Sequence, residues 1–320
     1  MSELAAPAGK THLIVSGTAR SGTTALAELL NAHEGICLGI ERFKFQYLRR
    51  NNYDAGMFAK DRFFDFRAED TNLTPEAKPA WAPVYEEMAR KWDGAAVIGD
   101  KVPDMAPVLG DFLRVNPDFR CIYILRNLKD VALSWQARAD RVRDSWPAGK
   151  GFEAACESWD AQMRAIHALT EQKAVRPRIL ILNYDTMYLD GGRSRDAILA
   201  FLELGPSAGY EATFARHAEF YAARSGQRVP RKFMPAFAAV DKLCAIEMRK
   251  RARSQVVRLT GGPAGAPGAG AKASPKAGGP KAGSPQAGSP KAGRKPGGPK
   301  AGPAAARRAG GGPDGGADAA

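Results

Sequence analysis

The chain has 320 residues, a formal net charge of +13 at pH 7 and 44% hydrophobic residues. No stretch approaches the roughly 18 apolar residues of a membrane span, and residues 1–10 lack the apolar core of a signal peptide. The four cysteines form no CxxC pair, which argues against a zinc site or a disulfide framework, so we expect a cytoplasmic protein.

The composition divides the chain into two parts. Residues 261–320 are almost entirely Ala, Gly, Pro and Lys and contain no Leu, Ile, Val, Phe, Tyr or Trp. Because such a segment has no large apolar side chains to bury, we expect a disordered tail. Its nine basic and two acidic residues contribute +7 of the net charge. A solvated tail is the default expectation, and weak contact with nucleic acid or an anionic surface is the alternative. Residues 1–260 are long enough for one domain.

The predicted elements of this domain alternate between strands and helices. Residues 12–16 form a short apolar run, which predicts a buried strand, and a glycine-bearing loop then leads into a predicted helix over residues 24–31. Further strands are predicted at residues 95–98, 120–125 and 178–182, and further helices at 104–114, 127–139, 152–172 and 194–203. This order predicts an α/β fold of the P-loop type, with a parallel sheet and helices on both faces.

Distinctive polar residues follow each of the four predicted strands. In parallel sheets, ligands bind at the carboxyl ends of the strands, so we expect these residues to share one site. Residues 42–92 are rich in aromatic and charged residues and should form loops and helices over that site. Most of the aromatic rings there are expected to serve packing.

The first strand is followed by GTARSGTT at residues 17–24, which has the outline of a phosphate-binding loop. Backbone N–H groups and a helix N-terminus converge on an anion in such a loop, and the hydroxyls of Ser21, Thr23 and Thr24 add donors. A Walker A loop needs lysine where this chain has Thr23, which argues against a magnesium-dependent NTPase. Arg20 supplies the positive charge instead.

The run RSGTT resembles the 5′-phosphosulfate loop of sulfotransferases that use PAPS (3′-phosphoadenosine 5′-phosphosulfate). The continuation from LLNAH at residues 29–33 to Glu41 resembles tyrosylprotein sulfotransferases and their bacterial relatives, although Ile40 replaces the first of two adjacent glutamates often seen there. The resemblance covers residues 11–205 as a pattern of motifs. It implies in-line transfer of a sulfuryl group from PAPS to a hydroxyl acceptor, with no metal. The implied contacts with the phosphosulfate are Arg20, Ser21, Gly22, Thr23 and Thr24.

A second motif, RNLKDVALSW at residues 126–135, resembles the 3′-phosphate motif of the same family. The resemblance implies that Arg126 and Ser134 bind the 3′-phosphate of the nucleotide. The guanidinium of arginine offers a planar fork of donors that suits phosphate oxygens. The alternative is that Arg126 is an ordinary surface residue.

Lys101 and Tyr184 follow two other predicted strands. The family places a lysine at the matching strand end, where its charge stabilises the bridging oxygen as the bond to sulfur breaks. The alternative for Lys101 is an ion pair with Asp100 or a solvated position. Tyr184 matches a family tyrosine near the nucleotide, but it would equally serve to cap the core.

Glu41 corresponds to the general base of the family. Its ordinary pKa of ~4.3 means that it is ionised at neutral pH and able to accept a proton. The alternative is a salt bridge to Arg42 or Lys44. Further contacts with the 3′-phosphate are possible from the basic loop at 224–232, where Arg228 and Lys232 are guesses.

The sequence therefore predicts a sulfotransferase domain at residues 1–260, with Glu41, Lys101 and Arg20 as catalytic residues. Two alternatives stay open at this point. One is a P-loop kinase, and the other is a nucleic-acid-associated protein that is recruited by its basic tail. The acceptor is not readable, because a tyrosine, sugar, lipid or small-metabolite hydroxyl fits equally well.

Overall fold

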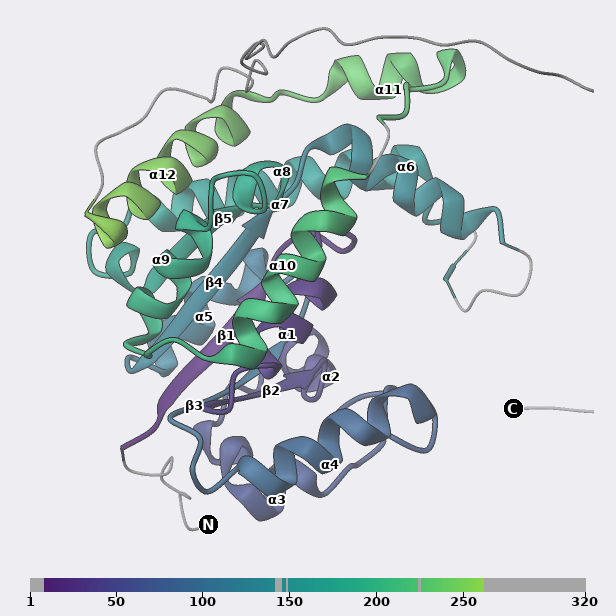
Figure 1. Cartoon of the computed structure of the whole chain (residues 1–320). Coiled ribbons are helices and arrows are strands. Elements are labelled where there is room, and N and C mark those ends of the chain that lie inside the picture. The colour runs from purple at the N-terminus through teal and green to yellow at the C-terminus, as the bar shows by residue number, and fades with distance from the viewer. Residues whose placement is uncertain (1–8, 142–145, 148, 224–225, 262–320) are drawn as a thin grey trace, which may run out of the picture. The chain divides into compact units, whose positions relative to one another are not determined.

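The computed structural model describes residues 9–141, 146–147, 149–223 and 226–261. Within these ranges, five parallel strands form one sheet in the order β2-β3-β1-β4-β5 (Figure 1). The strands are β1 (Thr11–Ser16), β2 (Ile36–Ile40), β3 (Val97–Lys101), β4 (Phe119–Leu125) and β5 (Ile179–Asn183). The predicted disordered tail lies outside the described residues, except for Gly261.

Helices connect the strands and cover both faces of the sheet. They are α1 (Thr23–Asn31), α2 (Lys44–Arg50), α3 (Lys60–Phe64), α4 (Ala82–Lys91), α5 (Ala106–Val115), α6 (Leu128–Ala139), α7 (Phe152–Glu171), α8 (Tyr184–Met187), α9 (Arg193–Leu202), α10 (Ala208–Ala222), α11 (Met234–Ala239) and α12 (Leu243–Thr260). Short 3-10 turns add η1 (Ala55–Phe58), η2 (Pro79–Trp81), η3 (Arg176–Arg178) and η4 (Arg231–Phe233). No helix of the described ranges is both long and apolar enough to span a bilayer.

The sheet is buried on both faces, and a separate apolar cluster covers each face. On β1, Leu13 and Val15 belong to the cluster that includes α1, α9 and α10, whereas Ile14 belongs to the cluster that includes α5, α7 and α12. All three side chains are fully buried. A strand that is covered on both sides reads as a continuous apolar run, which is why β1, β4 and β5 were predictable.

The register of the strands brings their carboxyl ends to one edge of the sheet. Lys101 of β3 pairs with Val15 on one side and with Ile40 on the other, and Leu125 of β4 pairs with Asn183 of β5. The residues after the strands therefore follow one another along this edge, beginning at Glu41 and ending at Tyr184. With neighbouring strands ~4.8 Å apart, the edge is roughly 20 Å long.

The prediction of four strands was incomplete, because β2 is a fifth strand. Its sequence, ICLGI, is short and is interrupted by Gly39, so the apolar pattern was too weak to find it. The predicted strand at residues 95–98 was displaced, since β3 begins at Val97 and continues through Asp100 and Lys101. Two buried charged residues at its end concealed the strand from a pattern based on apolar residues.

Residues 42–92 form α2, η1, α3, η2 and α4 beside β2 and β3, which confirms the predicted mixture of helices and loops. The rings of Phe43, Tyr47, Phe63 and Tyr85 are buried, and Tyr47 packs edge-on against Phe112 of α5 at 5.2 Å between centroids. These rings therefore serve packing. They hold the segment that carries Glu41 against the face of the sheet that is covered by α5, α7 and α12.

Candidate active site

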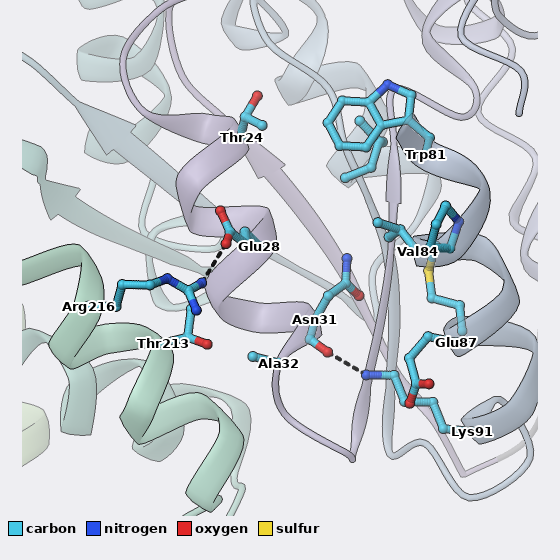
Figure 2. Close-up of a pocket in the computed structure, with 13 residues that line it drawn as sticks. Thr24, Glu28, Asn31, Ala32, Trp81, Val84, Glu87, Lys91, Thr213 and Arg216 are labelled. Carbon is cyan, nitrogen blue, oxygen red and sulfur yellow. Dashed lines mark hydrogen bonds and ion pairs between the residues drawn. The ribbon is translucent and has the colours of Figure 1, made fainter. Parts of the chain in front are cut away.

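The loop between β1 and α1 folds tightly at the centre of the sheet edge. The backbone N–H of Ser21 donates to the carbonyl of Thr18 at 2.9 Å, and α1 begins at Thr23. Gly22 has φ 98°, and a Cβ atom there would lie 2.4 Å from ring carbons of Tyr184. Only glycine fits this position, because Tyr184 packs directly on the backbone of the loop. Thr24 is exposed and lies at one end of a groove of about 540 Å³ (Figure 2).

The peptide of Ala19 anchors the loop from two sides. Its N–H donates to Asp104 Oδ1 at 2.8 Å, and its carbonyl accepts from Trp135 Nε1 of α6 at 2.9 Å. The N–H of Asp104 also donates to the carbonyl of Gly17 at 2.9 Å. Burial raises the pKa of Asp104. The turn after β3 and the helix after β4 thus hold the loop in one conformation.

The side chain of Arg126 contacts the backbone of the loop. Its Nη1 donates to the carbonyl of Arg20 at 2.9 Å, and its guanidinium carbon lies 5.1 Å from the centroid of the Tyr184 ring. Its Nη2 approaches Asp130 at 3.4 Å. Arg126 is only 8% exposed and contacts the loop, so it is not an ordinary surface residue.

Arg20 and Ser134 also meet, although they are far apart in the sequence. Arg20 Nε donates to Ser134 Oγ of α6 at 3.1 Å. Arg20 is exposed and has φ 73°, an uncommon conformation for a residue with a side chain. The structure thus links the two predicted anion-binding motifs through a side chain of the loop.

Glu41 forms a second polar cluster, next to the loop. Glu41 Oε1 accepts from Lys101 Nζ at 3.0 Å, and Oε2 accepts from Lys44 Nζ at 3.0 Å. Lys101 is 1% exposed. Burial alone would raise the pKa of Glu41, but the two ammonium groups outweigh it and lower the pKa. The carboxylate is therefore ionised at neutral pH.

These contacts identify the ion-pair partners of Glu41 and Lys101, and the salt bridge to Lys44 that was the alternative for Glu41 is present. Glu41 pairs with Lys44 as well as with Lys101, but not with Arg42. Lys101 pairs with Glu41, whereas the carboxylate of Asp100 accepts from the backbone N–H groups of Arg42 and Phe43, both at 2.9 Å. Burial raises the pKa of Asp100 to about 6, although these two hydrogen bonds favour its charged form.

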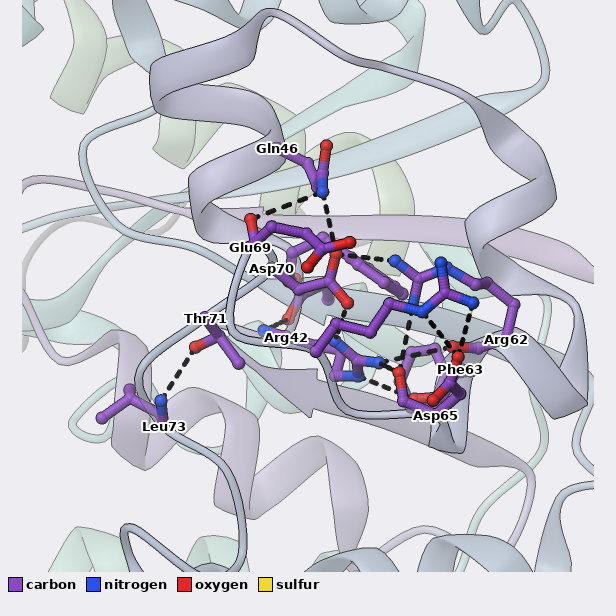
Figure 3. Close-up of polar contacts among 12 residues, drawn as sticks. Arg42, Gln46, Arg62, Phe63, Asp65, Glu69, Asp70, Thr71 and Leu73 are labelled. Carbon is purple, nitrogen blue, oxygen red and sulfur yellow. Dashed lines mark hydrogen bonds and ion pairs between the residues drawn. The ribbon is translucent and has the colours of Figure 1, made fainter.

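A buried network around Arg42 holds the turn that carries Glu41 (Figure 3). The guanidinium of Arg42 pairs with Asp70 at 2.8 Å, and both side chains are fully buried. It also lies between the rings of Phe43 and Phe66, at 4.4 and 4.3 Å from their centroids. Arg62 pairs with the other oxygen of Asp70 at 2.6 Å. The network connects α2 to the segment around Asp70, and so fixes the backbone immediately after Glu41.

The predicted site residues therefore lie along one edge of the sheet, in two contact groups. The loop, Arg126, Ser134 and Tyr184 form one group, and Glu41 and Lys101 form the other. Arg228 and Lys232 are exposed, and Lys232 lies over the ring of Phe233. Residues 224 and 225 of that basic loop lie outside the described residues.

Sequence reasoning missed three residues that position this site. Asp104 and Trp135 hold the peptide of Ala19, and Asp70 is the buried partner of Arg42. Each acts through a contact across more than 25 residues of sequence, which a local pattern does not show, although Trp135 is the last residue of the motif at residues 126–135. Asp104 lies just after the DKVP stretch, which is the nearest hint that the sequence offers.

A model of the sulfotransferase family matches residues 13–206. No curated protein sequence matches the chain. Similar solved structures include a sulfotransferase domain from the curacin biosynthetic pathway, with 13% identity, a TM-score of 0.42 and coverage of 79% of this chain and 96% of that one. Another is sulfotransferase STF1 from Mycobacterium tuberculosis, with 15% identity, a TM-score of 0.42 and coverage of 68% and 76%. A third is mouse sulfotransferase SULT7A1 complexed with PAP, with 16% identity, a TM-score of 0.39 and coverage of 80% and 86%. Only the family model is specific enough to support an assignment.

Replacing Asp104 tests how the loop is held. Asp104→Ala removes the acceptor of the Ala19 N–H and should reduce the free energy of unfolding by about 1–3 kcal/mol. Asp104→Asn keeps a side-chain oxygen and tolerates the φ of 62° at this position, so it should retain most of the stability. Urea denaturation of both variants measures the difference. Equal losses would contradict the role of the hydrogen bond.

Replacing Arg42 tests the network behind Glu41. Arg42→Met leaves Asp70 buried with one ion-pair partner fewer, which should cost about 3–5 kcal/mol of the free energy of unfolding. Arg49→Met is the control, because Arg49 is exposed and lies over the ring of Phe45, a contact that contributes about 0.5–1 kcal/mol. Chemical denaturation compares the two variants, and similar costs would show that the buried pair is not structurally important.

Proposed function

The chain belongs to the sulfotransferase family, and we propose that it uses PAPS as the donor and transfers the sulfuryl group to a hydroxyl acceptor. The observation that carries the proposal is the arrangement of two clusters on one sheet edge. One is a basic cluster of Arg20, Arg126 and Ser134, and the other is an ionised Glu41 beside a buried Lys101. The first suits a nucleotide with two anionic ends, and the second suits proton removal next to a fixed positive charge.

The basic cluster fits an anion in one further respect. Within the described residues, Nε of Arg126 is buried and has no hydrogen-bond partner. Buried donors normally have a partner, since a missing hydrogen bond costs about 1–3 kcal/mol. A bound phosphate would supply acceptors for the guanidinium of Arg126. The donor set of the site therefore fits PAPS.

We assign the two ends of PAPS to different parts of this cluster. The loop residues Arg20, Ser21, Gly22, Thr23 and Thr24 would hold the phosphosulfate, since α1 presents its N-terminus there. Arg126 and Ser134 would hold the 3′-phosphate, and Tyr184 would border the nucleotide. Arg20 donates a hydrogen bond to Ser134 in this structure. When both ends of PAPS bind, this hydrogen bond must either break or persist while Arg20 and Ser134 contact the same ligand.

The chemistry then depends on Glu41 and Lys101. When bound, PAPS supplies the sulfuryl group and leaves as PAP. Glu41 accepts the proton of the acceptor hydroxyl, and the ammonium of Lys101 offsets negative charge that develops beside it. Each oxygen of Glu41 accepts one lysine N–H and keeps further lone-pair capacity for the incoming proton. Positioning and electrostatics supply the remaining catalytic effect.

The two alternative functions have less support. A P-loop kinase needs a lysine at position 23, where Thr23 stands. Recruitment by nucleic acid depends on residues 261–320, which lie almost wholly outside the described residues. We propose residues 1–260 as the sulfotransferase domain, with residues 261–320 as a separate tail.

Nucleotide binding tests the assignment of the two phosphates. PAP should bind the full chain and raise its Tm much more than ATP does. Arg126→Ala should weaken PAP about 10- to 100-fold, because it removes a charge-assisted contact, and should weaken AMP by about threefold at most. Arg164→Ala, which removes an exposed arginine of α7, is the control. Equal weakening of PAP and AMP would remove the 3′-phosphate assignment, and stronger stabilisation by ATP would favour a kinase.

The pH dependence of turnover tests Glu41 as the base. Its active form is deprotonated and its pKa is lowered, so activity should be constant through the neutral and mildly acidic range and should fall only below the ordinary glutamate pKa of ~4.3. Lys44→Met removes one of the two charges that lower this pKa and should move the acidic limb of kcat/KM upward by about one pH unit. Lys60→Met is the control, because Lys60 pairs with Asp93 away from the site.

Glu41→Gln completes this experiment. It should reduce kcat by about 10²- to 10⁴-fold while PAP affinity stays nearly constant. An acidic limb that does not move in Lys44→Met, or a Glu41→Gln variant with normal turnover, would show that another group removes the proton.

A further inference from the structure

A groove of about 540 Å³ lies over the outward face of α1, between α4 and α10 (Figure 2). Its floor is formed by Thr24, Glu28 and Ala32, which lie four residues apart and therefore on one face of the helix. At 1.5 Å per residue, this floor is about 12 Å long. A volume of this size is typical of sites that hold small molecules.

One end of the groove adjoins the proposed reaction centre. Thr24 is the last residue of the phosphosulfate loop, and the side chain of Ile40, which also lines the groove, immediately precedes Glu41. Trp81 lies at the same end, across the groove from Thr24, as Figure 2 shows. The far end is formed by Lys91 and Asn31. A ligand in the groove would therefore extend from the sheet edge along α1.

The charged groups around the groove already have partners. Glu28 pairs with Arg216 of α10 at 2.5 Å and with His217 at 3.3 Å. Lys91 Nζ donates to the carbonyls of Asn31 and His33, at 2.6 and 2.8 Å. The lining has two acidic and two basic side chains, Glu28 and Glu87 against Lys91 and Arg216, so its formal charges balance and the groove offers little to an acidic or basic ligand.

The wall formed by α4 combines apolar side chains with Glu87, which pairs with Arg90 at 2.5 Å. The side of α4 that faces α1 contributes Val84 and Met88, and Trp81 and Ile40 extend this surface toward the loop. Val84 and Trp81 are only half-buried, so their apolar surface is available to a ligand. Covering such a surface is favourable in proportion to the apolar area that is removed from water.

We propose that this groove binds the body of the sulfuryl acceptor, and that the acceptor is an uncharged alcohol with an elongated apolar body. Its hydroxyl would lie at the Thr24 end, next to Glu41, and its apolar part would lie along α1 against Trp81 and Val84. This inference rests on the proposed function, because it assigns the acceptor of the same reaction. It selects one class among the hydroxyl acceptors that the sequence left open.

Primary alkanols from butanol to decanol are the probes for this proposal. Titration of each alkanol into the PAP-loaded full chain should show that the Kd falls about two- to fourfold for each added methylene until the groove is filled. The KM of the same alkanols in a transfer assay with labelled PAPS should follow this trend. A glucoside and an acidic tyrosine peptide serve as polar and charged comparison acceptors.

Val84→Trp fills the groove and should raise the Kd of decanol ~10-fold or more, while the affinity for PAP stays within about twofold. Glu86→Trp is the matched control, since Glu86 is exposed on the same helix and does not line the groove. The chain-length series on the unmodified protein needs no variant, so the test does not depend on the folding of Val84→Trp.

The outcomes separate the groove from the reaction. A Kd that does not depend on chain length, equal effects of the two tryptophans, or preferred transfer to the glucoside or the peptide would overturn the groove proposal and leave sulfuryl transfer standing. Chain-length-dependent binding that Val84→Trp abolishes would support the groove even if labelled PAPS gave no transfer. The absence of transfer from labelled PAPS to any of these acceptors would instead remove the proposed function.

Discussion

The parallel pairing of β1 with both β3 and β4 is the constraint on which the site depends. Because β1 occupies the centre of the sheet, the loop that follows it has a neighbouring strand end on each side. The turn after β3 supplies Asp104 and the helix after β4 supplies Trp135, and both side chains hold the same peptide of Ala19. A shift of either neighbouring strand by one residue would remove one of these contacts and also move Lys101 or Arg126 away from the loop.

The same edge contains several charged side chains that are largely removed from water. Burying a charge is costly unless it has a partner, and here each partner also fixes the position of a backbone segment. Asp70 neutralises Arg42 and thereby holds the turn after Glu41. Lys101 neutralises Glu41 and keeps it deprotonated. The ion pairs that offset the cost of burying these charges thus also fix the positions of the site residues before any ligand binds.

The sequence predicted the parts of this arrangement that are local. The strand-loop-helix unit around Arg20 was predictable because a run of apolar residues meets a glycine-bearing loop, and the helix after Arg126 was predictable from its own pattern. The strand β2 was not predictable, because Gly39 interrupts a run of five residues. Asp104 and Asp70 were not predictable either, since each acts on a distant segment. The bond between Arg20 and Ser134 depends on the relative positions of β1 and β4, which no local pattern contains.

The helix α1 explains why the donor side was readable from the sequence and the acceptor side was not. Its N-terminus completes the proposed phosphosulfate loop, and anion binding there requires particular residue types at particular positions. Its outward face, from Thr24 to Ala32, forms the floor of the groove, where the requirement is only a shape and a balance of charge. The walls of that groove come from α4 and α10, which are distant in the sequence from α1 and from each other. In the proposed function, donor recognition is therefore encoded in a short motif, whereas acceptor recognition is distributed over three helices that meet only in the folded chain.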